Sequence, residues 1–243
     1  MGSDDIVKKK MVENRKLRQE RKSNRNSKIR NQIPKVLILT EGKSEKIYFD
    51  KIKEILTLNT LDVIQSEYTD SNGIIKEAVR KAKKSQSDGD EYTFIFCIFD
   101  LDTVKNIEYL TVIEKSRLRD TKIIPIYTFP CIEVWFILHY EVCTKPFHSM
   151  GKKSIGDTVK NYLKERFEAT YSEANEECIR SFAEDYKRAI YNSTQLVKLQ
   201  TEVDSINPIS TIHQLILFLE NVKLPESNHI FERTIEELIE AKI

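Results

Sequence analysis

Two apolar, β-branched runs that end at acidic residues constrain the fold of this chain most strongly. Val36–Thr40 is followed by Glu41, and the longer run Thr93–Phe99 is followed by Asp100 and Asp102. Because neither run alternates with polar residues, both are typical of strands that are covered on both faces, as in a parallel sheet between helices. Open α/β sheets bind ligands at the carboxyl ends of their strands. We therefore expect these acids to converge if the two strands are neighbours.

Carboxylates gathered at one sheet edge repel one another. At roughly 4 Å and an effective dielectric near 20, each pair costs about 4 kcal/mol, so such a cluster favours proton uptake or a bound cation. Hard divalent cations take oxygen ligands, and the pattern therefore predicts a Mg²⁺ or Mn²⁺ site. The alternative is that Asp100 and Asp102 are ordinary acids of a surface loop.

The segment Glu41-Gly42-Lys43-Ser44-Glu45 has two interpretations. Gly42-Lys43-Ser44 resembles the end of a P-loop, but that motif requires a glycine where this chain has Leu37, so no nucleotide cradle is expected. In the second interpretation Gly42 makes a tight turn, and Glu45 returns toward Glu41 from the first turn of a helix. Glu45 then becomes a further metal ligand. The alternative is that Glu45 completes a helix cap or faces solvent.

Strands and helices alternate over the first half of the chain. Strands are predicted at 36–40, 61–67, 93–99 and 122–128, and helices at 44–56, 74–84 and 104–119, the first capped by Ser44. This order predicts a parallel sheet with right-handed crossovers. Beyond residue 129 only helices are expected, at 131–141, 158–169, 174–199, 209–222 and 231–241. The predicted domains are a flexible arm (1–34), an α/β domain (35–142) and a helical region packed on it (143–243).

The N-terminal arm is strongly basic. Residues 1–34 carry a net charge of +7, whereas the rest of the chain carries −6. A segment rich in Lys, Arg, Asn and Ser cannot fold alone, and such segments often bind polyanions. We expect it to bind nucleic-acid phosphates, with a solubilising tail as the alternative. The predicted nucleic-acid-binding residues are Lys8, Lys9, Lys10, Arg15, Lys16, Arg18, Arg21 and Lys22 of the arm and Lys43 beside the acids.

The sequence gives no sign of a membrane or an oxidising compartment. No apolar stretch approaches the roughly 18 residues of a membrane span, and the N-terminus is charged where a signal peptide is apolar. The four cysteines are widely spaced, without a C-x-x-C pair, which favours reduced thiols over disulfides or zinc ligands. A cytoplasmic protein without a membrane partner is expected. The sequence leaves the oligomeric state open, a homo-oligomer included.

At Glu41-Gly42 and Asp100-Leu101-Asp102 the chain resembles the TOPRIM fold of topoisomerases, bacterial primases and OLD-family nucleases. Residues 129–140, F-P-C-I-E-V-W-F-I-L-H-Y, are similar to the N-P-x-x-E-x-W-x-x-L-H-[FY] stretch of RloB-like proteins, a TOPRIM-bearing family associated with restriction and phage-defence loci. Residues 207–215 resemble that family's N-P-x-T-x-V-H-x-L segment. The chain departs from these patterns at Phe129 and Ser210, and neither departure removes an acid.

The resemblance implies a TOPRIM-like α/β fold and metal-dependent cleavage of nucleic-acid phosphodiester bonds in antiphage defence, alongside an ABC-type ATPase partner. In TOPRIM nucleases the residues matching Glu41, Glu45, Asp100 and Asp102 bind one or two divalent ions. The alternative function is a non-catalytic nucleic-acid-binding or ATPase-regulating subunit. The fourfold acid set favours catalysis, because a pure binder gains nothing from negative charge where phosphate must lie.

Glu133 is predicted to join Glu41, Asp100 and Asp102 as a catalytic residue. It begins the helix after the fourth strand among apolar neighbours, where a buried carboxylate is costly without a partner. It would act as a further ligand or as a general base, and the alternative is an acid that interacts with the positive end of the helix dipole. His139 and His213 are expected to be structural.

Overall fold

The computed structural model describes residues 33–101, 112–113, 116, 118, 120–173 and 175–223. Three predictions from the sequence therefore lie outside the described residues. These are the basic arm up to residue 32, Asp102 with most of the helix predicted at 104–119, and the helix predicted at 231–241.

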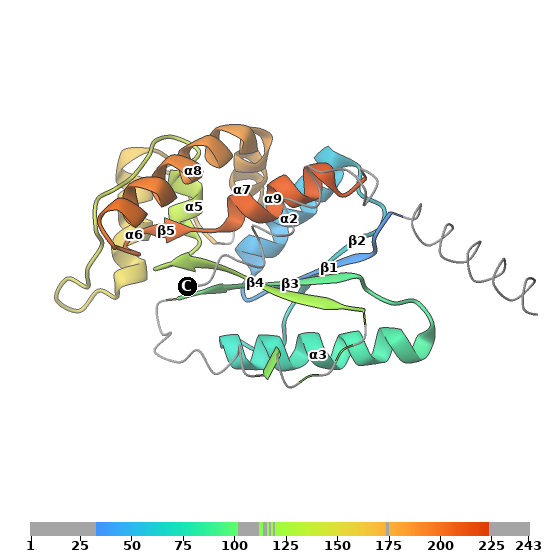
Figure 1. Cartoon of the computed structure of the whole chain (residues 1–243). Coiled ribbons are helices and arrows are strands. Elements are labelled where there is room, and N and C mark those ends of the chain that lie inside the picture. The colour runs from blue at the N-terminus through green and yellow to red at the C-terminus, as the bar shows by residue number, and fades with distance from the viewer. Residues whose placement is uncertain are drawn as a thin grey trace, which may run out of the picture.

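A five-stranded sheet forms the centre of the fold (Figure 1). Its strands are β1 (Val36–Thr40), β2 (Leu61–Gln65), β3 (Phe94–Asp100), β4 (Lys122–Phe129) and β5 (Ile209–Ser210). The strand order is β2-β1-β3-β4-β5. The first four strands are parallel, and β5 is antiparallel to β4. The mixed α/β class is confirmed, and the arrangement is consistent with a TOPRIM-like fold.

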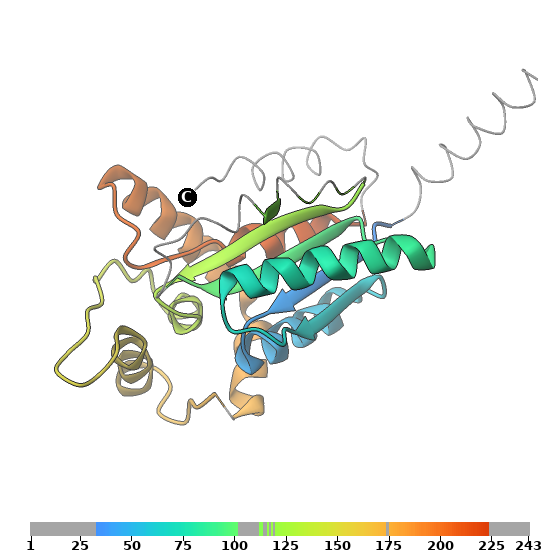
Figure 2. The same ribbon diagram turned by 90° about the horizontal axis from the view of Figure 1, so that it is seen from below.

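Helices cover both faces of the sheet. They are α2 (Lys43–Leu56), α3 (Ser71–Asp88), α5 (Glu133–Ile137), α6 (Ile155–Arg166), α7 (Glu176–Glu184), α8 (Tyr186–Glu202) and α9 (Ile212–Asn221). Figures 1 and 2 show α3 on one face, with α2 and α9 on the other. The helices α5 to α8 also lie on that second side, toward the end of the sheet to which the β4 arrow points.

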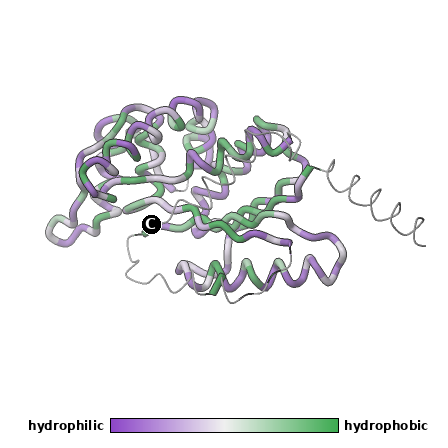
Figure 3. Tube along the Cα trace, viewed as in Figure 1, coloured by the Kyte–Doolittle hydropathy of each residue, from purple (hydrophilic) through white to green (hydrophobic). Residues whose placement is uncertain are grey.

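The core has two layers, one on each face of the sheet. Successive residues of β1 alternate between them: Ile38 packs in the layer that contains Trp135, whereas Leu37 packs in the layer that contains Ile74. All four side chains are fully buried. Figure 3 shows the middle of the sheet as mostly hydrophobic, which fits the fully apolar runs of β1 and β3 between two helical layers. The first layer runs from the sheet into α5 to α9, so the helical region and the α/β region share one core.

Several helix boundaries differ from prediction, those of α2 and α3 among them. The first residue of α2 is Lys43 and its cap is Gly42, without a side-chain hydrogen bond, so the prediction that Ser44 caps this helix is wrong. Instead, Ser44 is buried in the first turn. α3 is longer than predicted, because the Asp70 carboxylate caps its start and the helix continues to Asp88, where Gly89, at φ +73°, ends it.

The C-terminal region also departs from prediction. The single helix predicted at 174–199 is divided into α7 and α8 by Asp185. The start of the helix predicted at 209–222 is β5, a strand of two residues that sequence periodicity cannot reveal. β5 forms through tertiary pairing with β4, next to a hydrogen bond in which the Tyr127 N–H donates to Thr211 Oγ1 (2.9 Å).

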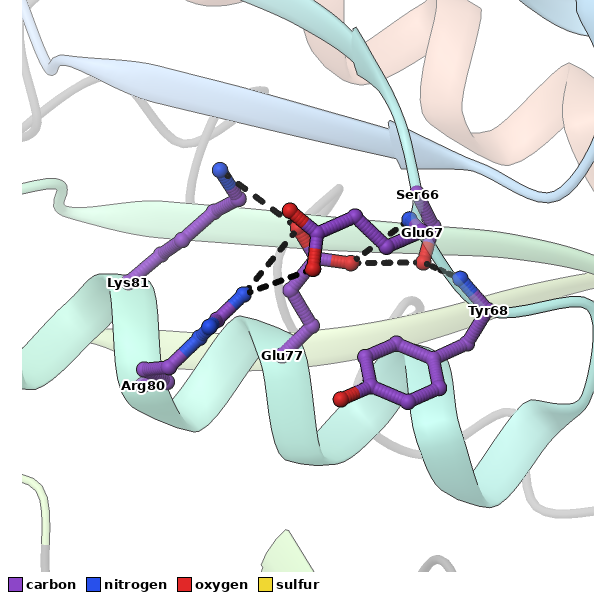
Figure 4. Close-up of polar contacts among 6 residues, drawn as sticks. All are labelled: Ser66, Glu67, Tyr68, Glu77, Arg80 and Lys81. Atoms are coloured by element: carbon purple, nitrogen blue, oxygen red, sulfur yellow. Dashed lines mark hydrogen bonds and ion pairs between the residues drawn. The ribbon is translucent and has the colours of Figure 1, made fainter.

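A buried carboxylate joins α3 to the end of β2 (Figure 4). Glu77 Oε2 accepts the Ser66 hydroxyl (2.6 Å) and the Glu67 backbone N–H (3.1 Å), and Lys81 Nζ lies 3.5 Å from Oε1. Arg80 reaches the same carboxylate from 3.9 Å. Burial alone raises the pKa of Glu77, but the hydrogen bonds from Ser66 and Glu67 and the charge of Lys81 outweigh it, and the net pKa is lowered.

We expect Glu77→Gln to lower the free energy of unfolding at pH 7 by about 1 to 3 kcal/mol, because the change weakens charge-assisted hydrogen bonds in a buried place. The lowered pKa means that the native contribution is present above the ordinary Glu pKa and is lost as pH falls through the folded pKa. Urea titrations should therefore show the two proteins converging in acid. The control Glu67→Gln alters an exposed acid and should stay within about 0.5 kcal/mol of wild type; equal losses would contradict the account.

Candidate functional site

Glu41 and Asp100 lie together at the carboxyl ends of two adjacent strands. The register pairs Thr40 with Ile98, and the Glu41 N–H donates to the Ile98 carbonyl (3.1 Å). The Asp100 backbone N–H donates to Glu41 Oε2 (3.1 Å). The carboxylate from β1 is therefore held at the end of β3. The adjacency of the two strands, on which the predicted site depends, is confirmed.

Glu45 approaches the same place from the first turn of α2. It is 4% exposed, and a Cβ at Gly42 would lie 2.6 Å from Glu45 Oε2. Only a glycine leaves room for the carboxylate to fold back over the turn. Burial raises the pKa of Glu45 to about 7, against a lowering by its own backbone N–H, and the charges of Glu41 and Glu133 add to the rise. Of the alternatives for Glu45, a solvent-facing acid is wrong, whereas contact with the first turn of the helix is observed.

Glu133 is the most deeply buried acid of the set, at 1% exposure. The Tyr171 hydroxyl donates to its Oε1 (2.7 Å), and Lys160 Nζ lies 4.0 Å from the same oxygen. Its Oε2 is buried and has no hydrogen-bond partner among the described residues. Leaving such an acceptor unsatisfied costs about 1 to 3 kcal/mol. Glu133 also begins α5, as the helix-dipole alternative requires, but that helix has only five residues.

Side chains from the C-terminal region complete the surroundings of Glu133. Lys160 on α6 forms an ion pair with Glu173, and this pairing together with the charge of Glu133 raises the pKa of Lys160 against the effect of burial. Burial raises the pKa of Tyr171, and the side chain of Ser44, at the start of α2, opposes that rise. Sequence reasoning missed Lys160 and Tyr171, because no motif marks them and only tertiary packing brings them to the site.

The pKa of Cys131 indicates that Glu133 and Asp100 lie near the same thiol. Its pKa is raised first by burial and then by the charges of Glu133 and Asp100. The thiol therefore lies within electrostatic reach of acids from both β3 and α5. The positions of Glu41, Glu45, Asp100 and Glu133 form what we call the acidic site. Asp102, the fifth predicted member, is outside the described residues.

The donor chemistry of the acidic site fits a hard divalent cation. Its members are all carboxylates, and one buried oxygen of Glu133 lacks a partner within the described part of the chain. Burial raises the pKa of Glu45 first, and the charges of the neighbouring acids add to the rise. Within the same residues, which omit Asp102, no group of three or more His, Cys, Asp or Glu side chains is close enough to hold a metal ion. A cation would therefore draw these carboxylates closer together.

The remaining predicted residues have separate places. Lys43 is exposed at the start of α2, beside the acidic site, whereas the eight arm residues from Lys8 to Lys22 are outside the described residues. His139 is buried, bonded to the Trp135 carbonyl (3.0 Å) and the Tyr48 hydroxyl (3.1 Å), and burial lowers its pKa to about 4. It is structural, as predicted. The four cysteines are free and buried.

Fold and site together define an α/β protein that gathers acids at the carboxyl edge of a mostly parallel sheet. A family model described as "RloB-like protein" matches residues 36–219, and the chain belongs to that family. The matched stretch contains every described residue of the acidic site. Comparison with curated proteins and with solved structures gave no match. None of the helices in the described part of the chain is long and apolar enough to cross a membrane.

Proposed function

We propose that this protein is a divalent-metal-dependent nuclease that cleaves nucleic-acid phosphodiester bonds. The observation that carries the proposal is the burial of Glu45 and Glu133 beside Glu41 and Asp100, at the edge where parallel sheets bind ligands. Burying like charges is unfavourable for a structural element, and it is expected of a site that binds a cation.

Glu41, Asp100 and the predicted ligands Glu45 and Asp102 would hold the ion, Mg²⁺ or Mn²⁺. When bound, it would polarise the phosphodiester and make water more acidic. We assign to Glu133 Oε2 the role of accepting a proton from the attacking water, because Tyr171 donates its hydrogen bond to the other oxygen of this carboxylate. Lys160 limits the negative charge that an approaching phosphate meets.

A role in antiphage defence and an ABC-type ATPase partner are what the association of RloB-like proteins with restriction and phage-defence loci implies for this member of the family. They are part of the proposal. The second candidate is a non-catalytic nucleic-acid-binding or ATPase-regulating subunit, and the absence of a close three-ligand group among the described residues is the observation in its favour.

Incubation of the purified protein with transfer RNA and with plasmid DNA tests the proposal. Each substrate is given Mg²⁺, Mn²⁺ or excess EDTA, with and without the cognate ATPase. The proposal expects cleavage of at least one substrate that depends on the divalent ion. Binding without cleavage in every condition would instead support the second candidate.

A further inference from the structure

The connection between α5 and α6 is a long loop that projects from the body of the protein. Figure 2 shows it, in yellow-green, on the side to which the arrowheads of β1 and β4 point. It is therefore at the same end of the molecule as the acidic site. We call residues 143–154 the basic loop.

Specific contacts hold the basic loop in shape. The Asn207 side chain accepts the Phe147 N–H (3.0 Å) and donates to the Phe147 carbonyl (2.7 Å). The Phe147 ring is buried against Tyr162, with the ring centroids 5.5 Å apart. Met150 and Lys153 form a β-bridge near the tip. A loop fixed in this way presents its exposed side chains with little loss of conformational entropy on binding.

The exposed side chains of the basic loop suit a polyanion. Between Glu141 and Asp157 the chain has no acid, but it has Lys145, Lys152 and Lys153, all exposed, in a body whose net charge without the arm is negative. Among the described residues, none of these lysines forms an ion pair with a carboxylate at 4.0 Å or less. Lys145 Nζ lies over the Tyr162 ring, 5.0 Å from its centroid, and the charges of Lys152 and Lys153 are available to an external partner.

An apolar side chain stands among these lysines. Met150 is 66% exposed at the tip of the basic loop, where nothing in the fold requires a hydrophobic residue. Proteins that bind nucleic acids use such side chains as wedges against or between bases. An exposed methionine within a group of lysines therefore indicates a partner that has both phosphates and flat apolar surfaces.

The base of the basic loop lies next to the acidic site. A Cβ at Gly156, just after the loop, would lie 3.9 Å from the sulfur of Cys131, which precedes Glu133 by two residues. One turn further along α6, Lys160 approaches Glu133. A strand held by the loop would therefore continue toward the acids.

We propose that the basic loop is a nucleic-acid clamp, in which Lys145, Lys152 and Lys153 contact the phosphodiester backbone and Met150 packs against a base. This inference rests on the proposed function, because it supplies the strand that the acidic site would cleave. Single-stranded and double-stranded DNA and RNA share the chemistry that these residues recognise.

The test is nucleic-acid binding by the full chain in excess EDTA, so that cleavage is not required. Fluorescence anisotropy is measured with labelled single-stranded RNA, single-stranded DNA and duplex DNA over a series of KCl concentrations. The triple variant Lys145→Gln, Lys152→Gln, Lys153→Gln is compared with the control Lys76→Gln, Lys83→Gln, Lys84→Gln, which removes equal charge from exposed positions on α3. The N-terminal arm is present in both proteins.

For at least one of the three ligands, the loop variant should bind more than tenfold more weakly at 0.1 M KCl. The magnitude of its log–log salt slope should fall by about 2 to 3, from 0.7 to 0.9 per lost phosphate contact. Met150→Ser should weaken binding about fivefold or more with an unchanged slope, as expected for a lost base contact. The ligand most affected identifies DNA or RNA. Equal effects of the loop and α3 variants, or unchanged binding in both, would overturn the clamp.

The same proteins separate the two proposals. If the loop variant loses binding while wild type never cleaves, the clamp stands and the nuclease proposal fails. If wild type cleaves and the loop variant binds and cleaves normally, the clamp fails alone.

Discussion

Asp100→Asn and Glu41→Gln should each lower the rate of divalent-dependent cleavage by at least about a hundredfold, because each removes a charged oxygen ligand from the acidic site. The backbone hydrogen bond from Asp100 to Glu41 Oε2 uses the N–H of Asp100 and is retained in the first variant. A loss of cleavage rate in Asp100→Asn would therefore come from the missing carboxylate charge. Initial rates with Mg²⁺ and Mn²⁺ on the substrate that wild type cleaves provide the measurement.

Glu67→Gln is the matched control for this pair. Glu67 lies just past β2, next to β1 in the sheet, but its side chain is 72% exposed. The control should cleave within about twofold of wild type. Far-UV circular dichroism should show the same fold for all four proteins. If both site variants kept wild-type rates, these acids would not be the catalytic centre.

Glu45→Gln should change how stability depends on pH. The folded pKa of Glu45, about 7, is raised above the ordinary value of 4.5. The wild-type protein therefore has the full contribution below pH 4.5 and loses it as pH rises toward and through 7. A rise of this size corresponds to about 3 kcal/mol. From pH 4 to pH 8, the free energy of unfolding of the variant should increase by about that amount relative to wild type.

A divalent cation should offset the loss of wild-type stability at high pH, because it stabilises the ionised carboxylate of Glu45. Urea unfolding at pH 8 should show stabilisation by Mg²⁺ that is reduced in Glu45→Gln. Glu54→Gln, at an exposed position on the same helix, should keep the wild-type response to Mg²⁺ and the wild-type pH profile above pH 6. Parallel pH profiles for wild type and Glu45→Gln would show that Glu45 titrates normally.

The features of the fold and of the acidic site that could be predicted are those that depend on the local sequence pattern. A strand buried on both faces has a continuous apolar run, and its end is fixed by the first charged residue, so β1, β3 and the acids Glu41 and Asp100 could be located. The turn at Gly42 brings Glu45 back by chain geometry alone. Glu133 could be singled out because a carboxylate among apolar neighbours requires a partner.

The rest depends on contacts between distant segments. Tyr171 and Lys160 reach Glu133 only after α6 and its following turn have packed against α5, and neither residue is part of a motif. β5 has only two residues, too few to show the alternating pattern of a strand. Its two residues would continue a helical pattern into α9 if β4 were not beside them. In the sequence, Glu77 looks like one more exposed charge on an amphipathic helix. Only the structure shows that it is buried and accepts a hydrogen bond from Ser66.

The central claim, that the acids of the acidic site hold a divalent cation, is tested most directly by anomalous X-ray diffraction from crystals soaked in Mn²⁺. We expect an anomalous peak bounded by carboxylate oxygens of Glu41 and Asp100, and its loss in crystals of Glu41→Gln soaked in the same way. A wild-type map with no peak there, or with manganese only elsewhere, would contradict it.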